Sequence, residues 1–128
     1  MYTIAEVAAK FNISKNALRY YENEGLLPPI ARDDTGIRHY SDDDLEAVNR
    51  VIRLRQLGAS VKETGWFNEE FSKDHPDYDE GLAFLARLEA ELNQKIAEIE
   101  QQQVFLNHKK SRLTREKAEQ NQNGAPMK

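Results

Sequence analysis

Leucine or isoleucine recurs at every seventh position through the C-terminal half of the chain. The row comprises Leu85, Leu92, Ile99, Leu106 and Leu113. No proline interrupts residues 81–115, so we expect one helix of about 50 Å at a rise of 1.5 Å per residue. A helix with a single narrow apolar seam cannot bury that seam on its own. The seam therefore predicts a coiled coil and leaves room for only one small domain before it.

A second apolar row beside the first is incomplete. We assign the subunit interface to both rows together: Leu85, Leu88, Leu92, Ile96, Ile99, Leu106 and Leu113. The helix is acidic over residues 89–100 and basic over residues 109–115. This change of sign favours an antiparallel homodimer, because opposite ends then meet. The alternative is a helix folded back on its own domain, and we expect the dimer instead.

Composition excludes several functions. The 128 residues include no cysteine, which excludes disulfides, thiolate zinc sites and thiol redox sensing. No segment has the apolar length of a membrane span, and Met1 leads directly into periodic sequence without a signal peptide, so we expect a cytoplasmic protein. The net charge of −4 argues against a general nucleic-acid binder. Most of the net negative charge lies in residues 69–101, which have 10 carboxylates and 3 cations.

The N-terminal segment has the signals of two short helices joined by a tight turn. Thr3 and Glu6 have the spacing of a capping box, and apolar residues follow at helical intervals. A turn at residues 12–13 precedes Ser14, which can cap a second helix that Gly25 would end. This arrangement predicts a helix-turn-helix, whose second helix enters the major groove of DNA.

The expected second helix has two different faces. Its polar face carries Lys15, Asn16 and Arg19, and its apolar face carries Leu18 and Tyr21. Lysine and arginine are natural donors to phosphates and guanine, and asparagine pairs with adenine. For Arg19, the alternative is a surface salt bridge with a neighbouring glutamate, Glu22 or Glu24, and we expect DNA contact instead.

A hairpin is expected over residues 30–40, with its turn at residues 33–36 and Arg32, Arg38, His39 and Tyr40 on its arms. Such a hairpin beside a recognition helix forms a wing. Ser41 with the three following aspartates predicts a helix start, and a metal site is the less favoured interpretation. Ser60 and Glu63 begin a further helix that contains Gly65 and is expected to be short or kinked.

The sequence thus divides into four parts. We predict a DNA-binding domain over residues 1–75, a linker at 76–80, the coiled-coil helix at 81–115 and a disordered tail at 116–128. The fold class is mostly α, a winged helix-turn-helix domain followed by a long C-terminal dimerisation helix. Near the junction lie four aromatic residues that we assign to the core, with a small apolar pocket as the alternative: Trp66, Phe67, Phe71 and Phe84.

Five motifs occur in a fixed order. They are Tyr-Thr-Ile-Ala-Glu-Val-Ala at 2–8, Leu-Arg-Tyr-Tyr-Glu at 18–22, Gly-Leu-Leu at 25–27, Gly-Ile-Arg-His-Tyr at 36–40 and Leu-Arg-Gln-Leu-Gly at 54–58. Together they closely resemble the MerR family of bacterial transcription regulators. The resemblance implies a dimer that binds a pseudo-palindromic promoter site and distorts its spacer, so that it affects RNA polymerase indirectly.

The resemblance also implies which residues contact DNA. Those that match the family's recognition helix and two wings are Lys15, Asn16, Arg19, Tyr20, Arg38, Tyr40, Ser60 and Lys62. Unlike metal-sensing and thiol-sensing members, this chain has no cysteine, and only a short segment follows the helix. A small-molecule effector is therefore an open question, and no metal or cofactor is expected.

Two other classes of function compete with this one. A coiled-coil adaptor that acts through protein partners without binding DNA is favoured mildly by the acidic pI of about 5.4. An enzyme is least favoured, because none of the three histidines has a neighbouring nucleophile.

Overall fold

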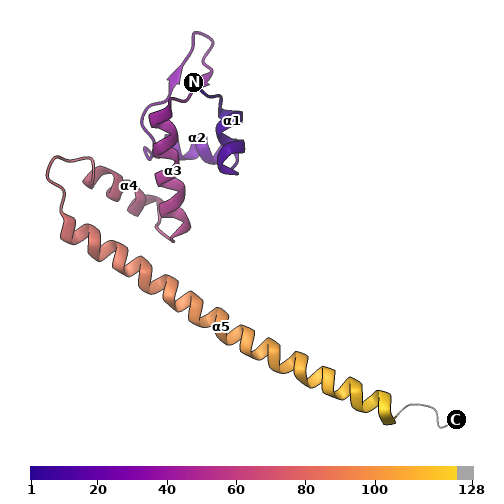
Figure 1. Ribbon diagram of the computed structural model, residues 1–128. Helices are drawn as coiled ribbons and strands as arrows, with labels where there is room; N and C mark the ends of the chain where they lie inside the picture. The colour runs from indigo at the N-terminus through magenta and orange to yellow at the C-terminus, as the bar shows by residue number, and fades with distance from the viewer. Residues whose placement is uncertain (124–128) are drawn as a thin grey trace. The chain divides into compact units, whose positions relative to one another are not determined.

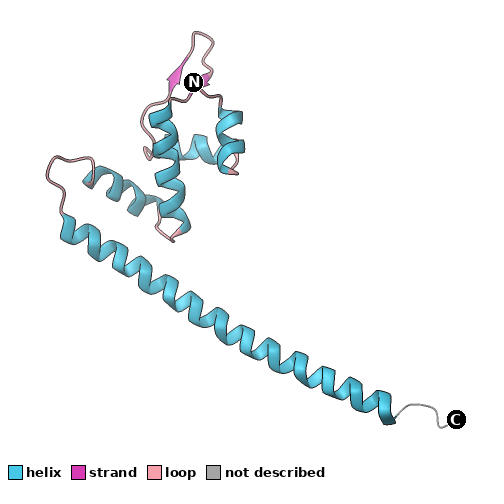
Figure 2. Cartoon of the chain, in the orientation of Figure 1, coloured by secondary structure: helices cyan, strands magenta, loops and turns pink. Residues whose placement is uncertain are grey.

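The computed structural model describes residues 1–123 and is mainly helical (Figures 1 and 2). The helices are α1 (Ile4–Phe11), α2 (Lys15–Asn23), α3 (Asp42–Gln56), α4 (Val61–Glu70) and α5 (Tyr78–Asn123). Strands β1 (Ala31–Arg32) and β2 (Arg38–His39) form an antiparallel hairpin between α2 and α3. The chain divides into a head unit, Met1–Leu88, and a rod unit, Glu89–Lys128. This confirms the expected fold class.

Side-chain caps fix the starts of the first four helices. Capping boxes begin α1 at Thr3, α3 at Ser41 and α4 at Ser60, and the Ser14 side chain caps α2. Each cap supplies an acceptor to a backbone N–H that has no partner in its own helix. Asn12 ends α1 with a left-handed backbone, φ 55°, a conformation that asparagine tolerates better than most residues. The expected helix-turn-helix is therefore confirmed.

One apolar core holds the helix-turn-helix, the hairpin and α3 together. Its fully buried side chains include Val7, Leu18, Tyr40 and Val48. The backbone of Tyr2 pairs with that of Tyr40 through hydrogen bonds of 2.9 and 2.8 Å. These bonds attach the N-terminus to the base of the hairpin and so fix the base of the wing to the core.

A second apolar cluster of the head unit surrounds Leu88. Leu88 is 1% exposed and packs with Leu54 and Ala59, and Phe67 and Phe84 lie against them. The assignment of Leu88 to the subunit interface is therefore wrong. The position of Leu88, three residues after Leu85, suits a coiled-coil seam as well as a domain core. The sequence period alone could therefore not show that Leu88 is buried in the head unit.

The four junction aromatics belong to the same packing. The Phe67 ring stacks on Phe71 with centroids 4.6 Å apart, and Trp66 meets Phe84 edge to face at 5.6 Å. The four rings contact one another but each is only partly buried, and Trp66, Phe67 and Phe71 also line an open groove, so their assignment to the core stays a prediction. Helix α4 continues without a break through Gly65, where an added Cβ would lie 3.4 Å from Leu26 Cδ2. The helix is short, at 10 residues, and it is not interrupted at the glycine.

Helix α5 is longer than expected at both ends. It begins at Tyr78, inside the expected linker, and it continues to Asn123. The expected disorder is therefore wrong for residues 116–123, and residues 124–128 lie outside the described part of the chain. Residues 116–123 are polar, but glutamate, lysine, alanine and glutamine are strong helix formers, and Arg112 pairs with Glu116 at 2.9 Å. Over residues 1–123, no helix is long and apolar enough to cross a bilayer.

The rod unit exposes its apolar residues. Leu92 is partly buried, and the other seam residues that lie in the rod unit are more than half exposed: Ile96, Ile99, Leu106 and Leu113. Val104 and Phe105 are also more than half exposed and lie off the seam. An apolar row of this length on an isolated helix is the surface that a coiled coil buries.

Candidate nucleic-acid interface

Helix α2 presents a polar reading face. Lys15, Asn16, Arg19 and Tyr20 are all exposed, whereas Leu18 on the opposite side is fully buried. Burial of Leu18 fixes the rotation of the helix and therefore the direction of this face. Arg19 Nη1 donates a hydrogen bond of 2.9 Å to Asn16 Oδ1. The guanidinium is thus held by an amide one turn earlier, and not by the glutamates considered as the alternative for Arg19.

Asp33 organises the turn of the wing. Its Oδ1 accepts hydrogen bonds from the backbone N–H of Thr35 and Ile37 at 2.9 and 3.0 Å and from the Thr35 hydroxyl at 2.6 Å. Its Oδ2 lies 2.9 Å from His39 Nε2. The hydrogen bonds from Thr35, His39 and Ile37 hold the pKa of the Asp33 carboxyl well below its ordinary value. The ionised carboxylate therefore shapes the hairpin tip.

Glu22 connects α2 to both strands of the wing. Arg38 Nε donates to Glu22 Oε1 at 2.7 Å, and Arg32 Nη2 lies 3.7 Å from Glu22 Oε2. The side chain of Arg38 is 16% exposed and that of Arg32 is 45% exposed. Arg38 is thus largely engaged with Glu22, while Arg32 presents more of its guanidinium to solvent. Arg32 therefore joins the candidate phosphate contacts, which the sequence-based set omitted.

Tyr40 does not belong to this surface. Its side chain is 0% exposed and lies in the head-unit core, and its hydroxyl has no hydrogen-bond partner. Burial of the side chain raises the pKa of the Tyr40 hydroxyl. The sequence-based placement of Tyr40 among the DNA contacts is wrong, because the backbone bridge to Tyr2 turns this side chain inward.

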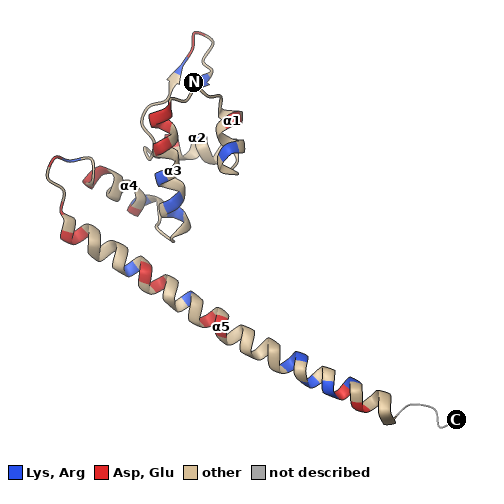
Figure 3. Ribbon diagram, in the orientation of Figure 1, with Lys and Arg blue, Asp and Glu red and all other residues tan. Residues whose placement is uncertain are grey.

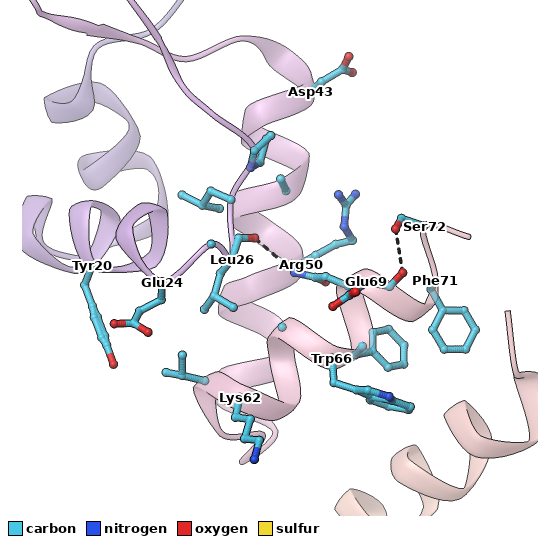
Figure 4. A pocket seen from close by; sticks show the side chains of 18 residues that line it. Tyr20, Glu24, Leu26, Asp43, Arg50, Lys62, Trp66, Glu69, Phe71 and Ser72 are labelled. Carbon is cyan, nitrogen blue, oxygen red and sulfur yellow. Dashed lines mark hydrogen bonds between the residues drawn. The ribbon is translucent and has the colours of Figure 1, made fainter. Parts of the chain in front are cut away.

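The start of α4 supplies the remaining candidates. Ser60 caps the helix with its hydroxyl, and Lys62 in the first turn is exposed. Lys62 and Tyr20 line one open groove of about 1440 Å³ between α2, α3 and α4 (Figure 4). The structure thus brings two residues to the same groove: Tyr20 of the recognition helix and Lys62, which was expected in the second wing.

The aspartates at 42–44 begin α3, and Asp44 closes the capping box with Ser41. Over residues 1–123, no group of three or more His, Cys, Asp or Glu side chains is arranged to hold a metal ion. In Figure 3 the ribbon of α3 is coloured for acidic residues at its start and for basic residues toward its end, a distribution of charge that the helix dipole favours.

The fold and this surface define a winged helix-turn-helix DNA-binding protein. Residues 2–64 match the family model described as MerR HTH family regulatory protein. An uncharacterised HTH-type transcriptional regulator of Haemophilus influenzae is 32% identical over 108 residues, which cover 84% of this chain and 80% of that protein. The chain belongs to the MerR family of DNA-binding transcriptional regulators.

Two further comparisons support the assignment. The transcriptional regulator AdhR of Bacillus subtilis is 41% identical over 59 residues, which span 46% of this chain and only 42% of AdhR. The crystal structure of HiNmlR, a MerR family regulator lacking the sensor domain and bound to promoter DNA, has a TM-score of 0.71 and 32% identity. It covers 91% of this chain and 93% of that chain. These similarities favour a DNA-binding regulator over the adaptor.

Proposed function

We propose that this chain acts as an antiparallel homodimer on a pseudo-palindromic promoter site and controls transcription by distorting the DNA between its two heads. The observation that carries the proposal is the exposed reading face of α2, with Lys15 and Arg19 over the buried Leu18. A rigid helix face with two cations and an amide has the donors needed for a major-groove edge and its flanking phosphates.

Each element of the surface has a separate role in this proposal. Arg19 and Asn16 contact bases or adjoining phosphates, and Tyr20 and Lys62 contact the backbone across the groove that they share. Ser60 caps the start of α4, and the N–H groups at a helix start are suited to phosphate. Arg32 and Arg38 belong to the wing, where contacts fix the register of the protein on DNA.

The dimer is needed for the distortion. A single head can bind one half-site, but bending or untwisting a spacer requires two heads held a fixed distance apart. The exposed leucine and isoleucine row of the rod unit supports such pairing. The protein then acts in the cytoplasm and affects RNA polymerase indirectly, by changing the shape of the promoter DNA. Binding of a small-molecule effector stays a prediction, and thermal-shift screening of compounds against the purified chain can test it.

Binding can be tested on DNA selected by the purified chain from a random duplex pool. We expect Arg19→Ala to reduce affinity for the selected site by at least about tenfold, the loss of one good base contact. Arg112→Ala removes the same charge from the rod unit, where Arg112 pairs with Glu116, and should change affinity by less than about threefold. Equal affinities of the parent and Arg19→Ala would overturn the assigned reading face.

Salt dependence tests the phosphate contacts. Lys62→Ala should weaken binding to every sequence alike and reduce the slope of log affinity against log salt by about one. If the affinity of the parent chain did not depend on salt, DNA binding would be contradicted and the adaptor function would be favoured instead. Sedimentation of the parent chain at micromolar concentration tests the dimer.

A further inference from the structure

The structure resolves which row completes the seam of the rod unit. Leu88 is buried in the head unit, whereas Ile96 is 52% exposed. Ile96 belongs to a different heptad row, which contains Glu89, Gln103 and Lys110. This second row alternates with the leucine and isoleucine row at spacings of three and four residues, as the two core rows of a coiled coil do. This second row of the core therefore contains both an acid, Glu89, and a base, Lys110.

One antiparallel alignment suits this pattern. It places Ile96 opposite Ile99 of the partner subunit, so that isoleucines form the central layers. Glu89 then faces Leu106 of the partner subunit, Gln103 faces Leu92 of the partner subunit, and Lys110 faces Leu85 of the partner subunit. Each polar side chain is thus opposite an apolar one, and no layer contains two polar residues.

The same alignment brings Glu89 near Lys110 of the partner subunit. Lys110 of the partner subunit lies four residues beyond the position opposite Glu89, an axial offset of about 6 Å. Side chains on a helix lean toward its N-terminus. Because the two helices run in opposite directions, each of these two side chains leans toward the other. Both occupy the same side of the seam, so a carboxylate and an ammonium group can meet there.

Other alignments lose the approach of Glu89 to Lys110 of the partner subunit. In a parallel dimer in register, Glu89 would meet Glu89 of the partner subunit, and the two copies of Lys110 would also meet, which places like charges together. An antiparallel shift by one heptad in either direction breaks the central layers, because Ile99 then faces Glu89 or Gln103 of the partner subunit. Helix α5 is acidic in its first half and basic toward its C-terminal end (Figure 3), and this distribution of charge also favours an antiparallel dimer.

We propose that Glu89 pairs with Lys110 of the partner subunit, twice in each dimer, and that these pairs fix the antiparallel register and select a second copy of this chain as the partner. The inference rests on the dimer of the proposed function. Over residues 1–123, neither Glu89 nor Lys110 takes part in an ion pair within its own chain. Polar residues in a coiled-coil core commonly fix register at some expense of stability.

The absence of cysteine allows a direct test of the register. A chain carrying Leu92→Cys and a second chain carrying Gln103→Cys are mixed and oxidised, with Lys110→Cys and Ile96→Cys as alternative second chains. Disulfide-linked dimers of Leu92→Cys with Gln103→Cys are expected. Preferred linking with Lys110→Cys or Ile96→Cys would show a shifted register, and efficient linking of Leu92→Cys to itself would show a parallel dimer; each result overturns the proposal.

Charge reversal tests the pair itself by sedimentation equilibrium. Glu89→Lys and Lys110→Glu should each raise the dimer dissociation constant about tenfold, and the double variant should return it to within about threefold of the parent. Glu98→Lys, which makes the same charge change on an outer face where Glu98 accepts a hydrogen bond from Gln94, is the matched control.

The outcomes separate this inference from the dimer on which it depends. A double variant that dimerises no better than the single variants would overturn the pair, even if the parent remains dimeric. Circular dichroism confirms that each variant retains its helix. A parent chain that is monomeric at micromolar concentration would instead contradict the proposed dimeric function.

Discussion

Arg38 of the wing donates a hydrogen bond of 2.7 Å to Glu22 of the recognition helix, and the two side chains are 16% and 15% exposed. This bond connects α2 directly to β2, whereas the proline-containing loop joins α2 to β1. Arg32 approaches the second oxygen of the same carboxylate at 3.7 Å. Glu22 therefore sets the position of the wing relative to the reading face.

Neutralising Glu22 should weaken DNA binding, although it removes a negative charge from the DNA-binding surface. Glu22→Gln loses the charged partner of Arg38, and we expect a loss of about 1 kcal/mol in affinity because the wing is then less well positioned. Glu24→Gln makes the same charge change at an exposed residue beyond the end of α2. That control should leave affinity unchanged or slightly raised. If Glu22→Gln also raises affinity, Glu22 acts only as a repulsive charge.

The sequence predicted the elements of the head unit well because their signals are local. The caps at Thr3, Ser14, Ser41 and Ser60 act within one helical turn, so a spacing of three residues is enough to locate each helix start. Lys15, Asn16 and Arg19 were also placed correctly on an exposed face, because helical periodicity alone separates them from the buried Leu18.

The errors concern side chains whose direction depends on distant contacts. Tyr40 follows Arg38 by two residues, just beyond the end of β2, but its bridge to Tyr2 turns it into the core. Leu88 fits a heptad pattern, but the cluster around Leu54 buries it in its own head unit. Neither the bridge nor the cluster has a local signature. Glu22 was missed as a positioning residue because Arg38 lies 16 residues away.

Acid should loosen the tip of the wing. The pKa of Asp33 is lower in the folded chain than in the unfolded chain, chiefly because Thr35, His39 and Ile37 donate hydrogen bonds to it. A lowered pKa means that the stabilisation is complete above the ordinary carboxyl pKa of about 3.9 and is lost as pH falls below it. Amide exchange at Thr35 and Ile37, measured by NMR, should therefore accelerate relative to the core as pH falls below about 4.

Asp33→Asn provides the control for this pH effect. The amide cannot ionise, so exchange at the hairpin tip should already be fast near neutral pH and should not change its ratio to core exchange on acidification. A parent wing that stays equally protected at pH 3 and pH 7 would contradict the role assigned to the Asp33 carboxylate.

Two glycine substitutions in helices should have opposite effects. An added Cβ at Gly81 would collide with the ring of Phe71, whose Cε2 would be only 2.7 Å away. Gly81→Ala should therefore lower the free energy of unfolding by about 1–3 kcal/mol. At Gly65 the new methyl group would lie 3.4 Å from Leu26 Cδ2, so a small rotation of the leucine would accommodate it. Gly65→Ala should be neutral or stabilise by up to about 1 kcal/mol, and thermal unfolding of both variants measures the difference.

Leu88 and Leu106 lie on the same helix, but truncating them should produce different defects. Leu88→Ala leaves a cavity in the head-unit cluster with Leu54 and Phe84, which should lower the free energy of unfolding by about 2–5 kcal/mol. Leu106 is 57% exposed in the single chain, so Leu106→Ala should leave the head unit intact and raise the dimer dissociation constant about tenfold, as expected for a truncated core leucine of a coiled coil. Urea unfolding followed by Trp66 fluorescence reports the head unit, and sedimentation reports the dimer. If Leu88→Ala instead altered only dimerisation, the side chain would belong to the subunit interface after all, since a residue buried within its own head unit must affect unfolding first.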